Sequence, residues 1–248
     1  MSFLQTCKTT CAVFLTALVL CLGSYEAFSY WPDSDAAPRH VNPPVSQMTP
    51  QQRASHMIQY LSEDGKSKAL CSGTAIGPHA LLTAAHCNDG RNDSKSDTIL
   101  IALSSHRFHI LGVTGDDRDH EIYLIDGPAF TNIAPFSTAG LTPGEHVQYY
   151  GFGEGIYPST MRQGHVRVQD DPSDLDALAK LYTFDFEAIH GDSGSAVFDD
   201  HGNIVGIASY VLDWYGNECM GAFALNFAPA KVLIAQHFNP ADKTTYPQ

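Results

Sequence analysis

Roughly a dozen short apolar runs, separated by turn residues, constrain the fold of this chain more than any other feature. Most are about four to eight residues long and rich in β-branched or aromatic side chains, with Gly, Asp, Asn or Pro between them. Such runs are typical of an all-β barrel or sandwich. They occupy residues 56–61, 69–76, 80–85, 98–103, 108–113, 121–125, 146–150, 165–169, 180–186, 195–198, 204–211 and 221–228. Residues 229–238 follow Pro229 at mixed helical spacing and predict a C-terminal helix packed on the last barrel.

Residues 1–27 have the pattern of a secretory signal peptide. Lys8 is the only charged residue before the apolar run, residues 12–22 are apolar apart from Thr16, and small residues follow. A helix over that apolar run would rise about 16 Å, whereas a bilayer core is about 30 Å thick, so an uncleaved anchor is the less favoured alternative. We therefore expect a secreted, extracellular protein with no membrane contact after signal cleavage.

The stretch at 28–53 is rich in Pro, Ser, Asp and Gln and lacks apolar periodicity. We interpret it as an extended or propeptide-like lead-in. The whole chain of 248 residues is long enough for one large or two small domains. Short apolar runs replace this composition from about residue 54, which places the start of the folded part there.

The chain is acidic, with 27 Asp and Glu against 14 Lys and Arg and a formal net charge of −13. Such a surface repels phosphate backbones and anionic lipids, so binding to nucleic acid or to a membrane surface is disfavoured. The 12 histidines show no paired metal-ligand spacing. We predict neither a catalytic metal nor a cofactor.

Three cysteines remain after the leader: Cys71, Cys87 and Cys219. An odd number in an exported protein predicts one bridge and one leftover thiol. Cys71 and Cys87 are the favoured pair, because they flank a strand-turn-strand segment that would bring them together. Cys219 would then be free and buried, or paired between molecules.

Two segments carry residues suited to nucleophilic catalysis. His86 ends a predicted strand and would be anchored by Cys87, which suits a general base. Ser193 lies in a Gly-Asp-Ser-Gly segment whose glycines would let the amides of Gly191 and Ser193 point at one spot and hold an oxyanion. A tight turn without catalytic use is the alternative interpretation. A carboxylate from the acidic stretch at 116–125 would orient the imidazole of His86.

These residues belong to longer motifs: Cys71-Ser72-Gly73-Thr74, Thr83-Ala84-Ala85-His86-Cys87, Tyr150-Gly151-Phe152-Gly153 and Gly191-Asp192-Ser193-Gly194. In these four motifs, the chain resembles the trypsin/chymotrypsin-like serine proteases. The segments 194–198 and 205–209 are similar to the bacterial and fungal glutamyl-endopeptidase branch. The resemblance implies two antiparallel β-barrels with the site in the cleft between them. It assigns residues 54–134 to an N-terminal barrel and 135–248 to a C-terminal barrel plus the terminal helix.

The family's register assigns the orienting acid to Glu121, with Asp119 as its rival. Ser209 matches the serine that hydrogen-bonds this acid and lines the substrate strand. The resemblance implies a specificity pocket that includes Glu187, Ser209 and Val211. Glu187 would favour basic substrates by charge pairing, or else point to solvent. Ala208 stands where glutamyl endopeptidases carry His, which argues against a strict preference for Glu.

Asp192 matches the family residue that pairs with an N terminus freed by proteolysis, although this chain has no Ile-Val-Gly-Gly start. Arg39-His40-Val41 and Arg53-Ala54 are candidate processing sites. The resemblance implies a monomeric secreted serine endopeptidase that cleaves a protein or peptide through an acyl-enzyme on Ser193. The alternative is a catalytically inactive pseudoprotease that acts as an extracellular binding protein. Inactive relatives usually lose Ser or His, and both are present here.

Overall fold

A computed structural model describes residues 45–61, 67–88, 98–101, 106–116, 119–137, 141–168, 181–184, 188–214, 217–224 and 229–242. The predicted leader at 1–27 and most of the lead-in lie outside the described residues. Residues from Asn42 onward form one compact unit. None of the helices in the described part of the chain is long and apolar enough to cross a membrane.

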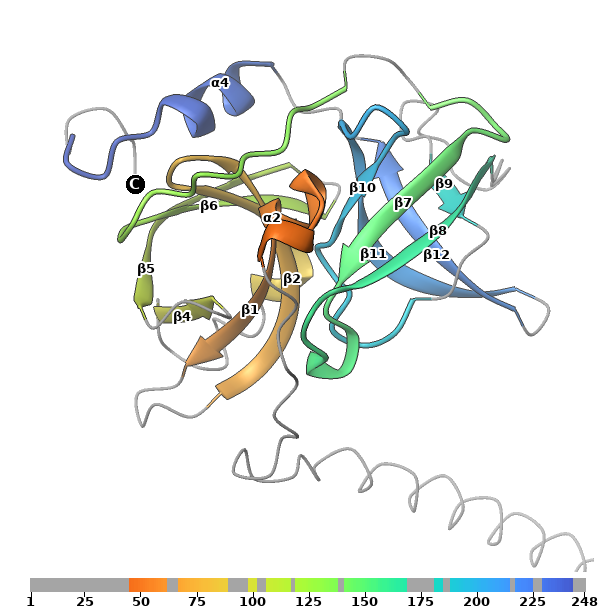
Figure 1. Ribbon diagram of the computed structural model, residues 1–248, viewed down its shortest axis with the longest axis horizontal. Helices are drawn as coiled ribbons and strands as arrows, with labels where there is room; N and C mark the ends of the chain where they lie inside the picture. The colour runs from red at the N-terminus through yellow and green to blue at the C-terminus, as the bar shows by residue number, and fades with distance from the viewer. Residues whose placement is uncertain are drawn as a thin grey trace, which may run out of the picture. The chain divides into compact units, whose positions relative to one another are not determined.

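Two closed antiparallel barrels make up the fold (Figure 1). Each predicted apolar run overlaps one strand, because alternate β-branched and aromatic side chains fill a barrel interior. Neighbours in the first barrel follow the order β1 (Ser55–Leu61), β2 (Ser67–Gly77), β3 (Ala80–Ala84), β6 (His120–Ile125), β5 (Arg107–Gly115) and β4 (Thr98–Ile101). Neighbours in the second follow the order β7 (His146–Gly151), β8 (Thr160–Val168), β9 (Leu181–Phe184), β12 (Asn217–Ala224), β11 (Ile204–Trp214) and β10 (Ala196–Phe198). The chymotrypsin-like two-barrel architecture is therefore confirmed.

The two barrels share a hydrophobic core at their junction. Tyr150 and Phe198 of the second barrel belong to the same buried cluster as Ile58 and Leu82 of the first. Short 3₁₀ turns lie at the barrel junctions: η4 (Ala85–Cys87) follows β3 and η5 (Gly153–Gly155) follows β7. The ends of strands from both barrels are thereby fixed at one place.

The end of the lead-in is folded rather than extended. Residues Val45–Gln47 form the turn η3, and Pro50–Ala54 form the short helix α2. Thr49 caps α2 by accepting a hydrogen bond from the Gln52 amide at 3.1 Å, and Pro50 supplies the fixed φ of a first helical turn. Helix α2 leads directly into β1, so this part of the lead-in belongs to the folded domain.

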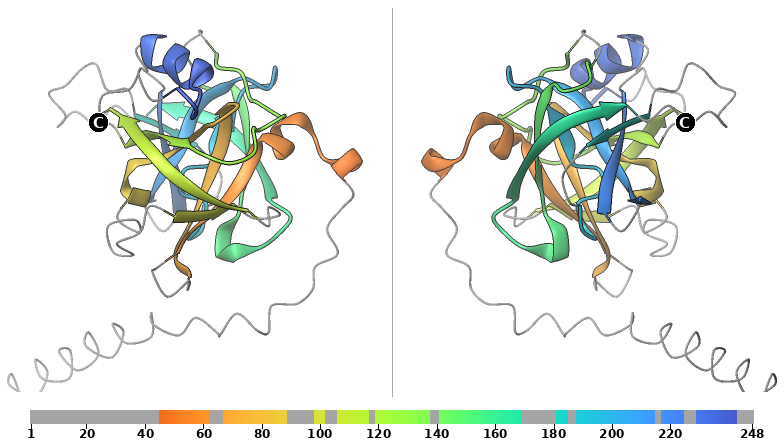
Figure 2. Two further views of the ribbon diagram at one scale, coloured as in Figure 1. Left: turned by 90° about the vertical axis from the view of Figure 1, so that its left-hand side faces the viewer. Right: turned by 90° about the vertical axis from the view of Figure 1, so that its right-hand side faces the viewer.

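The predicted C-terminal helix is present as α4 (Pro229–His237), but its predicted packing is wrong. It lies against the first barrel, not the last (Figures 1 and 2). Lys231 donates to the carbonyl of Gly115 on β5, and a Cβ at Gly77 on β2 would lie 2.6 Å from the carbonyl of Ala235. The missing side chain of Gly77 lets the helix backbone approach the sheet. The chain's last element therefore packs across to its first barrel.

Candidate active site

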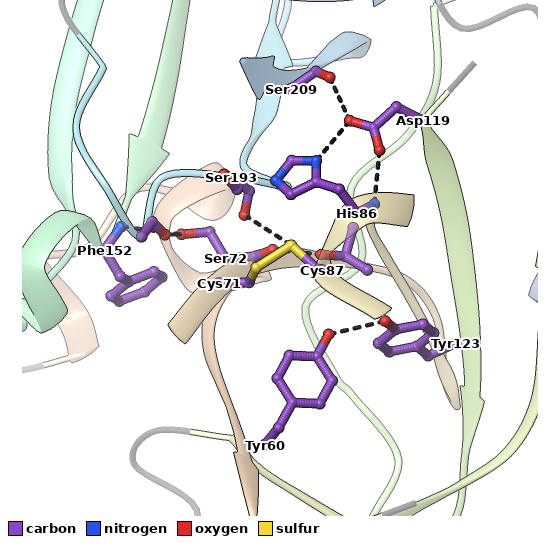
Figure 3. The surroundings of a disulfide bond; sticks show 12 residues. Tyr60, Cys71, Ser72, His86, Cys87, Asp119, Tyr123, Phe152, Ser193 and Ser209 are labelled. Carbon is purple, nitrogen blue, oxygen red and sulfur yellow. Dashed lines mark hydrogen bonds and ion pairs between the residues drawn. A yellow bond between two sulfur atoms is a disulfide. The ribbon is translucent and has the colours of Figure 1, made fainter. Parts of the chain in front are cut away.

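A disulfide anchors the candidate base. Cys71 on β2 is bonded to Cys87 in η4, as the sequence predicted, with Cα atoms 6.3 Å apart (Figure 3). His86 lies in the same turn and immediately precedes the bridge. Because the bridge ties η4 to β2, which is paired on both sides in the first barrel, the backbone that carries the imidazole has little freedom. Cys219 lies on β12, and its side chain is outside the described residues.

Asp119 holds His86 through both carboxylate oxygens. Nδ1 of His86 lies 2.8 Å from Oδ2, and the backbone amide of His86 donates to Oδ1 at 2.7 Å (Figure 3). Ser209 donates its hydroxyl to Oδ2 from β11. Burial raises the pKa of Asp119, but the hydrogen bonds from His86 and Ser209 outweigh it and lower the pKa below its ordinary value. An ionised Asp119 accepts from Nδ1–H, which fixes the tautomer in which Nε2 of His86 is the basic nitrogen.

The choice of Glu121 as the orienting acid is therefore corrected to its rival, Asp119. Glu121 faces another way: it is buried, and its Oε1 lies 3.5 Å from the side-chain amide of Asn88. The orienting acid was assigned to the wrong residue because the sequence pattern did not show where β6 begins. His120 is fully buried and bonded to Asp116 at 2.9 Å, so β6 begins before the apolar run that marks it in the sequence. Asp119 precedes it in a left-handed conformation (φ 65°), which turns its side chain toward η4.

Ser193 lies in a tight loop at the junction of the barrels. Its carbonyl accepts from the amide of Ser72 at 2.7 Å, and the amide of Gly194 donates to Ala208 O at 2.7 Å. The sulfur of Cys87 lies 3.8 Å from the carbonyl oxygen of Ser193, which places this loop beside η4. Figure 3 shows Ser193 next to the His86 ring, on the side of the nitrogen not bound to Asp119. The three distant segments of the predicted constellation therefore meet at one place.

The amides of Gly191 and Ser193 are free of acceptors within the described part of the chain. Gly191 has a φ of 101°, a value that favours glycine. Its carbonyl accepts from the hydroxyl of Ser72 at 2.7 Å, and that hydroxyl accepts in turn from the amide of Phe152 at 3.1 Å. Ser72 is not among the site residues predicted from the sequence, although it adjoins Cys71 in the Cys-Ser-Gly-Thr motif. The buried hydroxyl fixes the peptide plane that precedes Asp192.

The predicted specificity pocket is described only in part. Ser209 is buried and touches Asp119, as the resemblance implied. Val211 lies on β11 opposite Met220, but its side chain is outside the described residues. Glu187 lies outside them altogether. Across the described ranges, no group of three or more His, Cys, Asp or Glu side chains is placed to hold a metal ion.

A family model described as a trypsin-like peptidase domain matches residues 71–207, which is more than half of the chain. The chain belongs to this family. A serine protease HtrA-like protein of Staphylococcus epidermidis is 37% identical over 84 residues, which are 34% of this chain and only 14% of that protein. This trypsin-like peptidase chain therefore matches a small part of the length of its curated relative.

Two solved structures share the fold of this trypsin-like peptidase. An inactive form of Rv3671c from M. tuberculosis H37Rv, a serine-to-alanine mutant, aligns over 85% of this chain and 100% of that one, with 19% identity and a TM-score of 0.56. The HtrA-type protease AlgW with a tripeptide aligns over 77% of this chain and 64% of that one, with 19% identity and a TM-score of 0.57. At these identities, the likeness supports the fold and not the activity.

Proposed function

We propose that this trypsin-like peptidase is a secreted serine endopeptidase that forms an acyl-enzyme on Ser193. The supporting observation is the position of His86, which is held by Asp119 on one side and lies beside Ser193 on the other. An alcohol next to an oriented imidazole is the arrangement that activates a serine nucleophile.

In the proposed reaction, Oγ of Ser193 bonds to the carbonyl carbon of the scissile peptide as its proton passes to Nε2 of His86. The carbonyl oxygen becomes an oxyanion within reach of the amides of Gly191 and Ser193. When the carbon–nitrogen bond breaks, His86 returns the proton to the leaving amine. Water then attacks the ester, gives a proton to His86 and releases a carboxylic acid, and the proton returns to Ser193. Asp119 stays ionised and stabilises the imidazolium throughout.

Export is supported by two features. The leader-like residues 1–27 precede the lead-in, and a disulfide joins Cys71 to Cys87. Disulfides persist in oxidising compartments and are rare in the cytosol. Small or basic residues at the cleavage position are the proposed substrates. A strict preference for Glu is disfavoured, because Ala208 stands where the glutamyl-endopeptidase branch carries histidine.

A cleavage assay tests this proposal. Purified protein is incubated with a denatured protein substrate, and new termini are mapped by mass spectrometry, beside the Ser193→Ala variant. We expect internal cleavage by the unmodified protein and none by the variant. Binding of the substrate without cleavage in both samples would favour the pseudoprotease instead.

A further inference from the structure

Asp192 lies at the centre of the loop that carries the proposed oxyanion-binding amides. Its neighbours in sequence are Gly191 and Ser193, and its side chain is 1% exposed. The carboxylate points away from the site into the second barrel, so its contacts decide the orientation of the peptide planes on either side. A buried carboxylate is tolerated only where donors or a cation compensate for lost hydration.

Four donors surround this carboxylate. Oδ1 accepts from the amide of Gly153 at 2.8 Å, while Oδ2 accepts from the amide of Ile189 at 3.0 Å and the hydroxyl of Tyr149 at 3.0 Å. Oδ2 also forms an ion pair with Nη1 of Arg162. Three of these donors converge on Oδ2 and one contacts Oδ1, so each oxygen of the buried carboxylate has a compensating donor.

Strand register places Arg162 in this network. Arg162 on β8 pairs with Tyr149 on β7, its guanidinium donates to the Tyr149 hydroxyl at 2.8 Å, and its Cζ lies 5.7 Å from the centroid of that ring. Its side chain is mostly buried, with 19% exposed. Nothing in the sequence marked Arg162, because the pairing of β7 with β8 brings it to Asp192 from 30 positions away.

The glycines of the Gly-Phe-Gly motif make room for the same carboxylate. A Cβ at Gly151 would lie 2.1 Å from Oδ1 of Asp192, and one at Gly153 would lie 3.0 Å from it. Both positions must lack a side chain for Asp192 to enter. The motif, the arginine and the aspartate thus act as one structural unit.

We propose that Arg162 is a positioning residue that takes the place of a freed N terminus, so that the catalytic loop is assembled without proteolytic activation. The proposal rests on the proposed peptidase function. The resemblance to trypsin-like enzymes had implied that an α-ammonium pairs with Asp192. Here an internal guanidinium supplies the positive charge to a carboxylate that is only 1% exposed.

The candidate processing site nearest the folded domain agrees with this inference. Arg53 lies within α2, where its side chain donates to Asn132 at 3.0 Å and to the carbonyl of Met48 at 2.5 Å. Ala54 is buried, and the strand that begins at Ser55 is paired with β2. An N terminus created at Ala54 would be held at the start of β1, where Ser55 is paired with Thr74 on β2.

Substitution of Arg162 is the first test. We expect Arg162→Met to lower kcat about 100-fold, the loss typical of a misplaced oxyanion donor, with KM and the inhibition constant of a product peptide within about twofold. Arg162→Lys should restore most of kcat because it keeps the charge, and Arg107→Met on the exposed face of β5 should behave as wild type. A folded Arg162→Met protein with unchanged kcat would overturn the inference.

A second test uses the wild-type chain and does not depend on the folding of a variant. The rate of labelling by a fluorophosphonate probe is compared for the exported chain, the same chain with an N-terminal Gly-Ser extension, and the chain with a chemically acetylated N terminus. We expect equal rates within about twofold, since labelling needs the oxyanion-binding loop and not the terminus. Labelling that appears only after cleavage, and disappears on acetylation, would overturn the role of Arg162 alone. No labelling in any form would overturn the peptidase proposal as well.

Discussion

The carboxylate of Asp119 binds His86 twice, through the ring nitrogen Nδ1 at 2.8 Å and the backbone amide at 2.7 Å. This two-point contact fixes both the turn and the ring. The same geometry recurs at His109 and Asp126, where the distances are 2.8 Å to Nδ1 and 2.6 Å to the amide. A third contact of this kind joins His120 to Asp116, at 2.9 Å to Nδ1 and 3.2 Å to the amide. Of these three contacts within the described residues, the one at His86 lies beside Ser193.

Asp119→Asn should lower kcat by about 10⁴-fold, because an amide cannot hold the required tautomer or stabilise the imidazolium. Two control variants are available: Asp126→Asn removes the matching contact elsewhere, and Glu121→Gln removes the acid that sequence register had favoured. Both should retain kcat within about threefold of wild type. Steady-state hydrolysis of a peptide ester measures all three. A larger loss for Glu121→Gln than for Asp119→Asn would restore Glu121 to the orienting role.

The lowered pKa of Asp119 makes part of the stability pH-dependent. Its folded pKa lies below the unfolded value of about 3.9, so the folded state binds fewer protons and the contribution is complete above that value. It is lost as pH falls through the folded pKa. Urea unfolding between about pH 3 and 7 should therefore show a stability gap between wild type and Asp119→Asn that narrows in acid. A gap that is constant with pH would contradict the shift.

Ser209→Ala should raise the pKa of Asp119 toward its ordinary value, because it removes one of the hydrogen bonds that stabilise the carboxylate. A hydrogen bond to a charged group contributes about 1.5–3 kcal/mol, so we expect about a tenfold fall in kcat. The loss of stability in acid should be smaller than in wild type and should level off at a higher pH, because the folded pKa then lies closer to the unfolded value. If the free energy of unfolding of the variant depends on acidic pH as it does in wild type, Ser209 does not stabilise the ionised form of Asp119.

The Cys71–Cys87 bridge should contribute about 3 kcal/mol to the free energy of unfolding, as expected for a loop of this size. The two residues are separated by 16 positions. Urea denaturation of a Cys71→Ala, Cys87→Ala double variant measures the loss, and kcat should also fall because η4 is no longer tied to β2. Added reductant should weaken wild type and leave the double variant unchanged. Equal free energies of unfolding for the two proteins would show that the bridge does not stabilise the fold.

Gly194→Ala should destabilise the protein by about 3 kcal/mol or more, through backbone strain and overpacking together. A Cβ at Gly194 would lie 2.3 Å from both the carbonyl of Ser72 and the hydroxyl of Thr83. Gly144 has a similar φ, 83° against 85°, but a Cβ there meets nothing within 4 Å. Gly144→Ala should therefore lose only about 1–2 kcal/mol. Equal losses at the two glycines would show that the loop is not packed against β2 and β3.

The strands and the disulfide could be predicted because their signals are local. Alternating β-branched residues mark a barrel strand wherever they occur, and Cys71 and Cys87 flank a short hairpin-like segment. The packing of α4 could not be predicted, since nothing near Pro229 indicates that Gly77 leaves space on a distant strand.

The site was predictable in kind but not in every residue. His86 and Ser193 are marked by motifs, whereas the orienting acid depends on where β6 begins. The buried His120 conceals that start, because a histidine interrupts the apolar pattern from which strands are predicted. The role of Arg162 could not be predicted for a different reason, because the pairing of β7 with β8 determines which side chains it meets.

The most direct measurement is the site of covalent modification by a fluorophosphonate probe. The labelled protein is digested, and the modified residue is identified by mass spectrometry beside the Ser193→Ala and His86→Ala variants. We predict one adduct, on Ser193, which is absent from the first variant and strongly slowed in the second. An adduct on another residue, or equal labelling of the His86→Ala protein, would contradict the proposed catalytic site.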